Sequence, residues 1–316
     1  KNVGLFDLTP FSKFEIKSDK AHQELQKICT ANIKNEPGKC VYTHMLNSDG
    51  GIETDLTVVC VDKNHFRIIS SAATRERDKF HINKHLSKNV ELKDITDDLC
   101  VFGLFGPKSR DLLKTLSEDN FENDQFRFGF AKFITIDGVK IWTQRLSYVG
   151  ELGYELYVDL KDAKKIYELL IEKGKDFNLS NCGMHAMDIM RMESGFLHWG
   201  HDISPEENQY QAGLAFTISN KKDVDFIGKQ ALEKIKQDKV KTRFSMFTLK
   251  ESEPGKPLLL HDEPIYDGEK IIGRSTSGNY SFNFKKNLVF GYINNDFSNE
   301  ELQNKNLFIE VEKKKY

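Results

Sequence analysis

The stretch YTHMLNSDGGIETDLTV, residues 42–58, constrains the fold more than any other part of this chain. Its centre, SDGG, has the composition of a hairpin turn, because two adjacent glycines adopt positive φ at no steric cost. Apolar positions flank this turn on both sides. The stretch therefore predicts two neighbouring antiparallel strands joined close to Gly50.

Asp55 lies inside the second of these predicted strands. Ile52, Leu56 and Val58 share one parity of the strand, so Asp55 is expected on the opposite face from this apolar set. A carboxylate there is either a solvated surface group or points into a cleft, and the pattern alone leaves both interpretations open.

Short strand-like runs alternate with helix-like segments up to about residue 160, which is typical of an α+β or α/β protein. We expect a helix over about residues 19–30, capped by Ser18 or Asp19, and a second helix over about 75–86. A third helix is expected over 162–173, with Gly174 as its stop.

A second unit is predicted from about Val101, where a strand is followed by a helix that starts around Pro107. Two further strands are expected at about 131–136 and 139–145. After Gln237 the pattern changes to short strands with frequent turns and without an intervening helix, which predicts a separate small all-β module.

The charge and cysteine content exclude several classes of protein. Lysine and arginine number 46 against 48 acids, so no global positive field would attract nucleic acid. No apolar run approaches the roughly 18 to 20 residues that cross a bilayer, so we expect no membrane association. The five cysteines form no CxxC pair, which argues against a disulfide framework or a zinc site. We expect a reducing compartment, the cytoplasm or, in a eukaryote, the mitochondrial matrix.

Two further motifs carry side chains suited to binding. LSYVGELGYELYV contains Tyr148 and Glu155; the alternative reading is a hairpin whose acids simply flank glycines. MHAMDIMRMESGF places Arg191 three residues after Asp188 on a predicted helix, a spacing that also allows a structural ion pair.

The motif HWGHDI contains His198 and His201. Two histidines three residues apart with one aspartate, on an expected loop, lack the second ligand pair of strong zinc motifs, so we predict no metal and interpret the histidines as lining a pocket or packing a loop. No GxGxxG follows a strand, and neither GxxxxGK[ST] nor GxSxG occurs, so no dinucleotide fingerprint predicts an FAD or NAD site in this chain.

Taken in order, these motifs resemble one family, the folate-binding aminomethyltransferases of the glycine cleavage system. The resemblance extends from Val3 to about Ile293 and is closest to the C-terminal folate half of dimethylglycine and sarcosine dehydrogenases, because DLTPF and the complete HWGHDI favour that branch. The matching runs are VGLFDLTPFSKFEI, YTHMLNSDGGIETDLTV, LFGPKSRDLL, RLSYVGELGYELYV, GMHAMDIMRMESGFLHWGHDI, AGL, DFIGKQAL and GRSTSGNYS.

The resemblance implies an α+β fold of clover-leaf form. Two intertwined ferredoxin-like α/β units over residues 1–236 and a C-terminal β-barrel over 237–316 would surround a central folate channel. It implies that Asp55 is the catalytic acid near the 5- and 10-nitrogens of tetrahydrofolate. Glu155 would accept hydrogen bonds from the pterin edge, while Tyr148 packs on the ring system or on the p-aminobenzoyl unit.

Three other residues are candidates for binding. The resemblance implies that Arg191 neutralises a folate glutamate, and the alternative is that it holds its helix through Asp188. His198 and His201 are expected to bind substrate. Where the family often has a TPLEAGL-like run, this chain has NQYQAGL, with Gln211 at the usual acid.

The implied function is tetrahydrofolate-dependent transfer of a methylene unit from an oxidised N-methyl amine, of the dimethylglycine or sarcosine type, to form 5,10-methylenetetrahydrofolate. Its partner would be an FAD-dependent amine-oxidising domain, upstream or separate. The chain opens at Lys1 directly on a strand-like pattern, without a charged leader and an apolar core, so we expect a preceding segment to be missing. Two alternatives stay open: a folate-dependent demethylase acting on a sulfonium or amine, and a non-catalytic folate-binding or regulatory domain.

Overall fold

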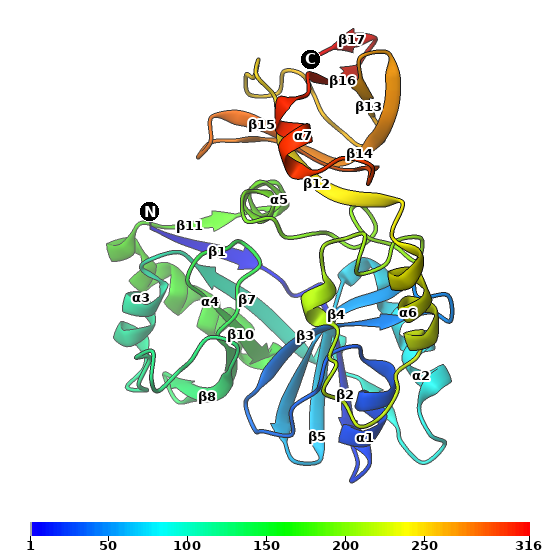
Figure 1. Cartoon of the computed structure of the whole chain (residues 1–316). Coiled ribbons are helices and arrows are strands. Elements are labelled where there is room, and N and C mark those ends of the chain that lie inside the picture. Colours follow the sequence, from blue (N-terminus) through cyan, green and yellow to red (C-terminus); the bar gives the residue numbers. More distant parts are fainter. Residues whose placement is uncertain (1) are drawn as a thin grey trace. The chain divides into compact units, whose positions relative to one another are not determined.

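The computed structural model describes residues 2–316, and within them the chain forms a mixed α+β structure with three sheets (Figure 1). The chain divides into two compact units. The first comprises Lys1–Met45, Thr54–Met187 and Ser219–Phe226, and the second comprises Leu46–Glu53, Asp188–Ile218 and Ile227–Tyr316. The α+β class expected from the sequence is confirmed.

The first unit contains a six-stranded sheet, called sheet A here. Its strand order is β11 (Leu179–Cys182), β1 (Val3–Asp7), β7 (Leu99–Phe105), β10 (Gly153–Asp159), β9 (Val139–Gln144) and β8 (Ala131–Ile136). The N-terminal strand β1 lies between β11 and β7, so distant segments of the chain interleave (Figure 1).

Helices α3 (Ser109–Leu116) and α4 (Leu160–Gly174) build the core on one face of sheet A. Leu112 from α3 and Ile166 from α4 are fully buried against Leu104 and Leu156 of the sheet. This packing uses the alternate residues of β7 and β10, so the intervening residues, among them Glu155, lie on the opposite face.

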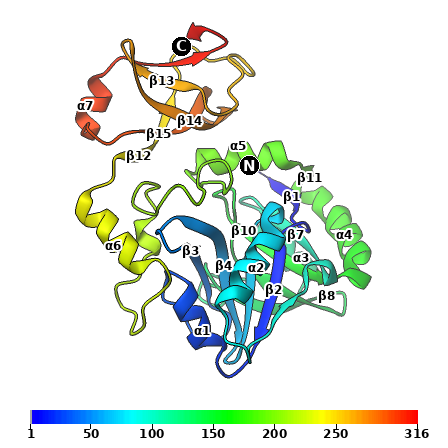
Figure 2. The ribbon, with the colours of Figure 1, turned by 90° about the vertical axis from the view of Figure 1, so that its right-hand side faces the viewer.

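A five-stranded sheet in the same unit is called sheet B here. Its strand order is β3 (Cys40–Leu46), β4 (Ile52–Asp62), β5 (His65–Ser70), β2 (Ser12–Lys17) and β6 (Leu92–Asp94). Helix α1 (Ala21–Ile28) packs on β5 through the stacked rings of His22 and Phe66, and α2 (Arg75–His85) adjoins β6. Figure 2 shows both helices in the part of the unit that contains β2, β3 and β4. Short 3-10 turns span Ala72–Thr74, Thr96–Asp98 and Lys175–Phe177.

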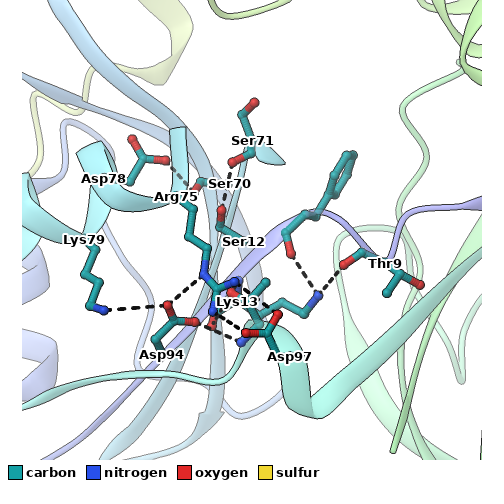
Figure 3. Close-up of polar contacts among 12 residues, drawn as sticks. Thr9, Ser12, Lys13, Ser70, Ser71, Arg75, Asp78, Lys79, Asp94 and Asp97 are labelled. Atoms are coloured by element: carbon teal, nitrogen blue, oxygen red, sulfur yellow. Dashed lines mark hydrogen bonds and ion pairs between the residues drawn. The ribbon is translucent and has the colours of Figure 1, made fainter. Parts of the chain in front are cut away.

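A buried lysine and an arginine hold the start of β2 in place (Figure 3). The Lys13 ammonium donates to the Thr9 and Phe11 carbonyls at 2.7 and 2.8 Å, and burial lowers its pKa to about 8. Arg75 bridges Asp94 and Asp97. These contacts fasten the loop between β1 and β2 and join α2 to the end of the sheet.

The second unit contains a six-stranded barrel-like sheet. Its order is β12 (Thr242–Thr248), β15 (Lys286–Asn294), β14 (Lys270–Ser281), β13 (Pro264–Asp267), β16 (Leu307–Val311) and β17 (Lys314–Lys315). The unit also holds α6 (Lys229–Asp238), α7 (Asn299–Asn304) and a 3-10 turn at Ala215–Thr217, while α5 (Met184–Glu193) crosses the boundary between the units.

Two local expectations were wrong. The Ser18 hydroxyl accepts from the Lys20 N–H at 3.2 Å, but α1 begins at Ala21 and no side chain caps it. Gly174 is the last residue of α4, as expected, although it keeps helical φ, a 3-10 turn follows, and the chain first turns left-handed at Asn178. Gly174 is also required for packing, because a Cβ there would lie 2.6 Å from Leu179 Cβ.

The second error concerns the all-β module, which does contain a helix, α7. A reciprocal pair of hydrogen bonds starts this helix: the Ser298 hydroxyl accepts from the Glu301 N–H, and the Glu301 carboxylate accepts from the Ser298 N–H. Such a capping box stabilises even a short helix. None of the helices within residues 2–316 combines the length and apolar character that a membrane span requires.

Candidate active site

The predicted hairpin forms and places Asp55 on the face expected from its parity. The Asn47 N–H donates to the Gly51 carbonyl at 3.0 Å, and β3 and β4 are neighbours in sheet B. Ile52 and Val58 are almost completely buried, whereas the Asp55 side chain on the other parity keeps 17% of its surface exposed. The carboxylate therefore lies neither in the apolar core nor free in solvent.

Two residues of β3, Tyr42 and His44, surround the Asp55 carboxyl. The His44 Nε2 lies 3.7 Å from Asp55 Oδ1 and 3.2 Å from the Tyr42 hydroxyl. The Tyr42 hydroxyl is in turn hydrogen-bonded to the Asp55 carboxyl. Asp55 Oδ1 itself is buried and finds no hydrogen-bond partner among the described residues.

Burial determines the protonation of this group. It raises the pKa of Asp55 from 3.8 to about 7, against the Tyr42 hydrogen bond and with a further contribution from the charge of Asp78. It lowers the pKa of His44 to about 3, so this imidazole is neutral near pH 7. The contact between His44 and Asp55 is thus not an ion pair, and Asp55 exchanges a proton close to neutral pH.

Asp78 is a second buried carboxylate in this unit, and it is fully held by hydroxyl groups. Thr54, Ser70 and Thr74 donate to it at 3.1, 2.6 and 2.7 Å, and burial raises its pKa. Figure 3 shows Asp78 on α2 next to Ser70. Because Thr54 precedes Asp55 in β4, this network fixes the strand that carries the candidate acid.

Glu155 lies on the face of sheet A opposite its core. It is 7% exposed, and the Tyr157 hydroxyl donates to its Oε2 at 2.8 Å. Burial raises the pKa of Glu155 to about 7, against this hydrogen bond. Glu155 is therefore also a carboxyl that titrates near neutral pH with few donors around it.

The Glu155 face of sheet A and the Asp55 face of sheet B approach each other. Burial and then the charge of Glu155 raise the pKa of the Cys40 thiol, so β3 lies close to Glu155. Arg67, which pairs with Val59 and so shares the face of Asp55, lies 5.8 Å from the centre of the Tyr157 ring.

Tyr148 lies on the half-buried loop between β9 and β10. Tyr42 as a residue is 39% exposed, so the location of its hydroxyl decides its pKa. Desolvation of this hydroxyl, then Asp55 and Tyr148, raise the pKa of Tyr42 well above its ordinary value, so Tyr42 lies close to both. The structure thus brings three predicted residues, Asp55, Tyr148 and Glu155, around strand β3. Sequence reasoning missed Tyr42 and His44, although both sit at alternate positions of the strand that faces Asp55 across the turn.

Arg191 belongs to the second unit, where it is 2% exposed. Its guanidinium donates to Asp188 at 2.9 Å, to Asp202 at 2.5 Å, to the Phe196 carbonyl at 3.0 Å and to Ser277 at 2.8 Å. The ion pair with Asp188 that the spacing allowed is therefore present. Binding of a folate glutamate by Arg191 stays a prediction.

His198 and His201 lie on the loop after α5, as expected. Their ring centres are 4.7 Å apart, and burial followed by the charge of Arg191 lowers the pKa of His198. Their role in substrate binding stays a prediction. Across residues 2–316 no group of three or more histidine, cysteine or acidic side chains is arranged to hold a metal ion.

Comparison with known proteins places this geometry in context. The family model of the GCVT N-terminal domain matches residues 1–222 of the sequence. The family model of the glycine cleavage T-protein C-terminal barrel domain matches residues 243–316. The 4-methylaminobutanoate oxidase (formaldehyde-forming) of Paenarthrobacter nicotinovorans is 37% identical over 89% of this chain and 34% of its own length. The mitochondrial dimethylglycine dehydrogenase of Rattus norvegicus is 33% identical over 93% of this chain and 34% of its own length.

The fold matches a solved structure as well. The glycine cleavage system aminomethyltransferase T from Bartonella henselae superimposes with a TM-score of 0.86 at 20% identity, covering 99% of this chain and 83% of that one. The present chain spans about a third of the length of the two curated relatives. The two domain matches, which together take in nearly every residue, show that this chain belongs to the aminomethyltransferase family of glycine cleavage T-proteins.

Proposed function

We propose that this chain catalyses tetrahydrofolate-dependent one-carbon transfer, in which a methylene unit from an oxidised N-methyl amine of the dimethylglycine or sarcosine type yields 5,10-methylenetetrahydrofolate. The observation that carries the proposal is the Asp55 carboxyl, which is held on a sheet face with a pKa of about 7 and one unpartnered oxygen among the described residues. Membership of the family supports it, and so do the names of two relatives, both of which act on N-methylated amines.

The side chains on the facing sheets fit tetrahydrofolate. The pterin edge presents adjacent N–H donors, and Glu155 offers a carboxylate with a single hydroxyl donor, that of Tyr157, in the described structure. Tyr148 supplies an aromatic ring for the flat ring system or the p-aminobenzoyl unit. When bound, tetrahydrofolate supplies the 5- and 10-nitrogens that accept the one-carbon unit.

Asp55 is the proposed catalytic residue. Because its pKa lies near 7, its carboxyl takes up or returns a proton at a nearby amine nitrogen close to neutral pH, and its ionised form stabilises positive charge. Tyr42 and His44 orient the carboxyl, and Asp78 fixes the strand behind it. The buried surroundings strengthen each of these electrostatic contacts.

Amine oxidation would take place on an FAD-dependent domain upstream of this chain or on a separate protein. We assign residues 1–236 to the folate-binding region and residues 237–316 to the barrel. Arg191, His198 and His201 are retained as candidate binding residues.

Two variants separate binding from chemistry. Glu155→Gln is expected to weaken tetrahydrofolate binding about ten- to a hundredfold in anaerobic titration calorimetry, because a charge-assisted pair is lost, whereas Asp55→Asn should bind nearly as tightly as the wild type. Single-turnover formation of 5,10-methylenetetrahydrofolate, in a fusion to an FAD-dependent amine-oxidising domain, should fall by about two to four orders of magnitude in Asp55→Asn. Amine oxidation, followed separately, is the control. Product formation by Asp55→Asn at the wild-type rate would refute the role of Asp55.

A further inference from the structure

The face of sheet A that carries Glu155 contains a second polar side chain, which no sequence motif marked. In the antiparallel pair of β9 and β10, Gln144 lies directly opposite Glu155, and Trp142 lies opposite Tyr157. Directly opposed residues project to the same side, with Cβ atoms about 4.5 to 5.5 Å apart. Gln144 and Glu155 are therefore side-by-side neighbours on the proposed binding face.

The Gln144 amide is buried without a partner. The residue is 0% exposed, and neither Oε1 nor Nε2 meets a hydrogen-bond partner anywhere in residues 2–316. The large majority of buried side-chain polar atoms in proteins are hydrogen-bonded, since an unpaired amide carries its full desolvation cost. An amide with both ends unpaired thus points to a partner that is not part of the chain.

Thr143, the preceding residue of β9, shows that burial in this sheet does not by itself leave a polar side chain without a hydrogen bond. Thr143 is equally buried but lies on the core side, opposite Leu156, and its hydroxyl donates to the Ile141 carbonyl at 3.5 Å. Of these two residues, only Gln144 has side-chain polar atoms without a hydrogen bond in the described chain.

Other unpartnered donors lie on the same pair of faces. The Trp142 Nε1 is buried without an acceptor in the described chain, and so are Nε and Nη1 of Arg67, whose guanidinium lies over the Tyr157 ring. Together with Asp55 Oδ1 these groups all lie on the two facing sheet surfaces. They mark a place where a polar, flat ligand would satisfy groups from both sheets.

We propose that Gln144 is a ligand-binding residue whose carboxamide, beside the Glu155 carboxylate, recognises the pteridine ring of tetrahydrofolate; this inference rests on the proposed function. The two side chains are complementary in chemistry. A carboxylate only accepts, and so suits adjacent N–H donors, whereas a carboxamide both donates and accepts, and so suits a ring acceptor next to an N–H. The pteridine ring presents both patterns along its edges.

The test compares Gln144→Met with the matched control Thr143→Val, which removes a buried polar group from the other face of the same strand. Anaerobic calorimetry with tetrahydrofolate should show about 5- to 100-fold weaker binding for Gln144→Met and a change of less than about twofold for Thr143→Val. The same loss is expected with 6-methyltetrahydropterin, which carries the ring without the tail. If Gln144→Met weakened the binding of tetrahydrofolate but not that of 6-methyltetrahydropterin, the assignment of Gln144 to the ring would be overturned.

A second readout needs no ligand. If the amide is unpaired in the free protein, Gln144→Met should unfold at the same or a higher urea concentration than the wild type, because the substitution removes a desolvated polar group. A destabilised Gln144→Met with unchanged affinity would make Gln144 a structural residue and overturn the inference. Gln144→Glu, which keeps a polar side chain but lacks the amide donors, replaces Gln144→Met if the latter does not fold, with the same loss of affinity expected.

The outcomes also separate this inference from the proposed function. If the wild type does not bind tetrahydrofolate, the proposed function fails. If the wild type binds and Gln144→Met binds equally well, the proposed function stands and the role of Gln144 is refuted.

Discussion

Replacing Asp55 by asparagine should make the protein more stable at alkaline pH while it removes the catalytic acid. Burial raises the pKa of Asp55 to about 7 in the folded protein from 3.8, so the folded state retains a proton that the unfolded chain releases. The stabilising contribution of this group is complete below about pH 3.8 and is lost as the pH rises through 7. Asparagine does not ionise, so the variant escapes this loss.

The size of the effect follows from the pKa difference. The rise of the Asp55 pKa from 3.8 to about 7 corresponds to about 4 kcal/mol, which is a ceiling for the whole pH range. The side chain keeps 17% exposure, and relaxation and water entry reduce real burial penalties. We therefore expect the variant to gain about 1 to 2 kcal/mol over the wild type in free energy of unfolding between pH 5 and pH 8.

Urea unfolding of the wild type and Asp55→Asn at pH 5, 6, 7 and 8 measures this difference directly. Every other titrating group is common to both proteins, so its effect cancels in the difference between their free energies of unfolding. The informative quantity is how this difference changes with pH. Asp49→Asn, which alters an exposed acid of the same hairpin, is the matched control and should run parallel to the wild type. Parallel curves for Asp55→Asn as well would refute the argument that Asp55 is held protonated by its surroundings.

Three other predictions follow from the described contacts. Because the pKa of Glu155 lies near 7, wild-type affinity for tetrahydrofolate should fall up to about tenfold per pH unit below pH 7, and calorimetry from pH 6 to 8 should show no such dependence in Glu155→Gln. Arg191→Met leaves Asp202 and Asp188 without their cation and should lower the free energy of unfolding by about 3 to 5 kcal/mol in urea titration; a loss below about 1 kcal/mol would contradict the buried network. Treatment with EDTA should leave the heat of tetrahydrofolate binding unchanged, and binding abolished by chelation would show that the site depends on a metal.

The hairpin and the side of Asp55 were predictable because both follow from local rules. Two glycines fix the turn, and the period of two along a strand then fixes each side chain's face. Ile52 and Val58 are buried and Asp55 is not, as the alternation required. Glu155 was identified differently, from the resemblance of its motif LSYVGELGYELYV to the family and not from strand alternation.

Tertiary contacts were not predictable from local patterns. Gly174 ends α4, as expected, and its small size also allows the close approach of Leu179, a contact that no local pattern shows. Gln144 was not identified for a related reason. Its meaning depends on the register between β9 and β10 and on the absence of a partner in the described chain, and a single sequence displays neither.

The number of donors around each acid separates the structural carboxylates of this protein from the candidate functional ones. Asp78 accepts from three hydroxyls, and Asp202 accepts from Arg191, Thr276, Ser277 and the His198 N–H. Asp55 and Glu155 are each hydrogen-bonded to a single tyrosine hydroxyl in the described structure, and burial raises the pKa of each to about 7. A fold selected for stability alone would surround these two acids with donors or replace them by apolar residues. That it keeps them on facing sheets, next to an unpartnered amide, is the pattern expected where a ligand completes the hydrogen bonds.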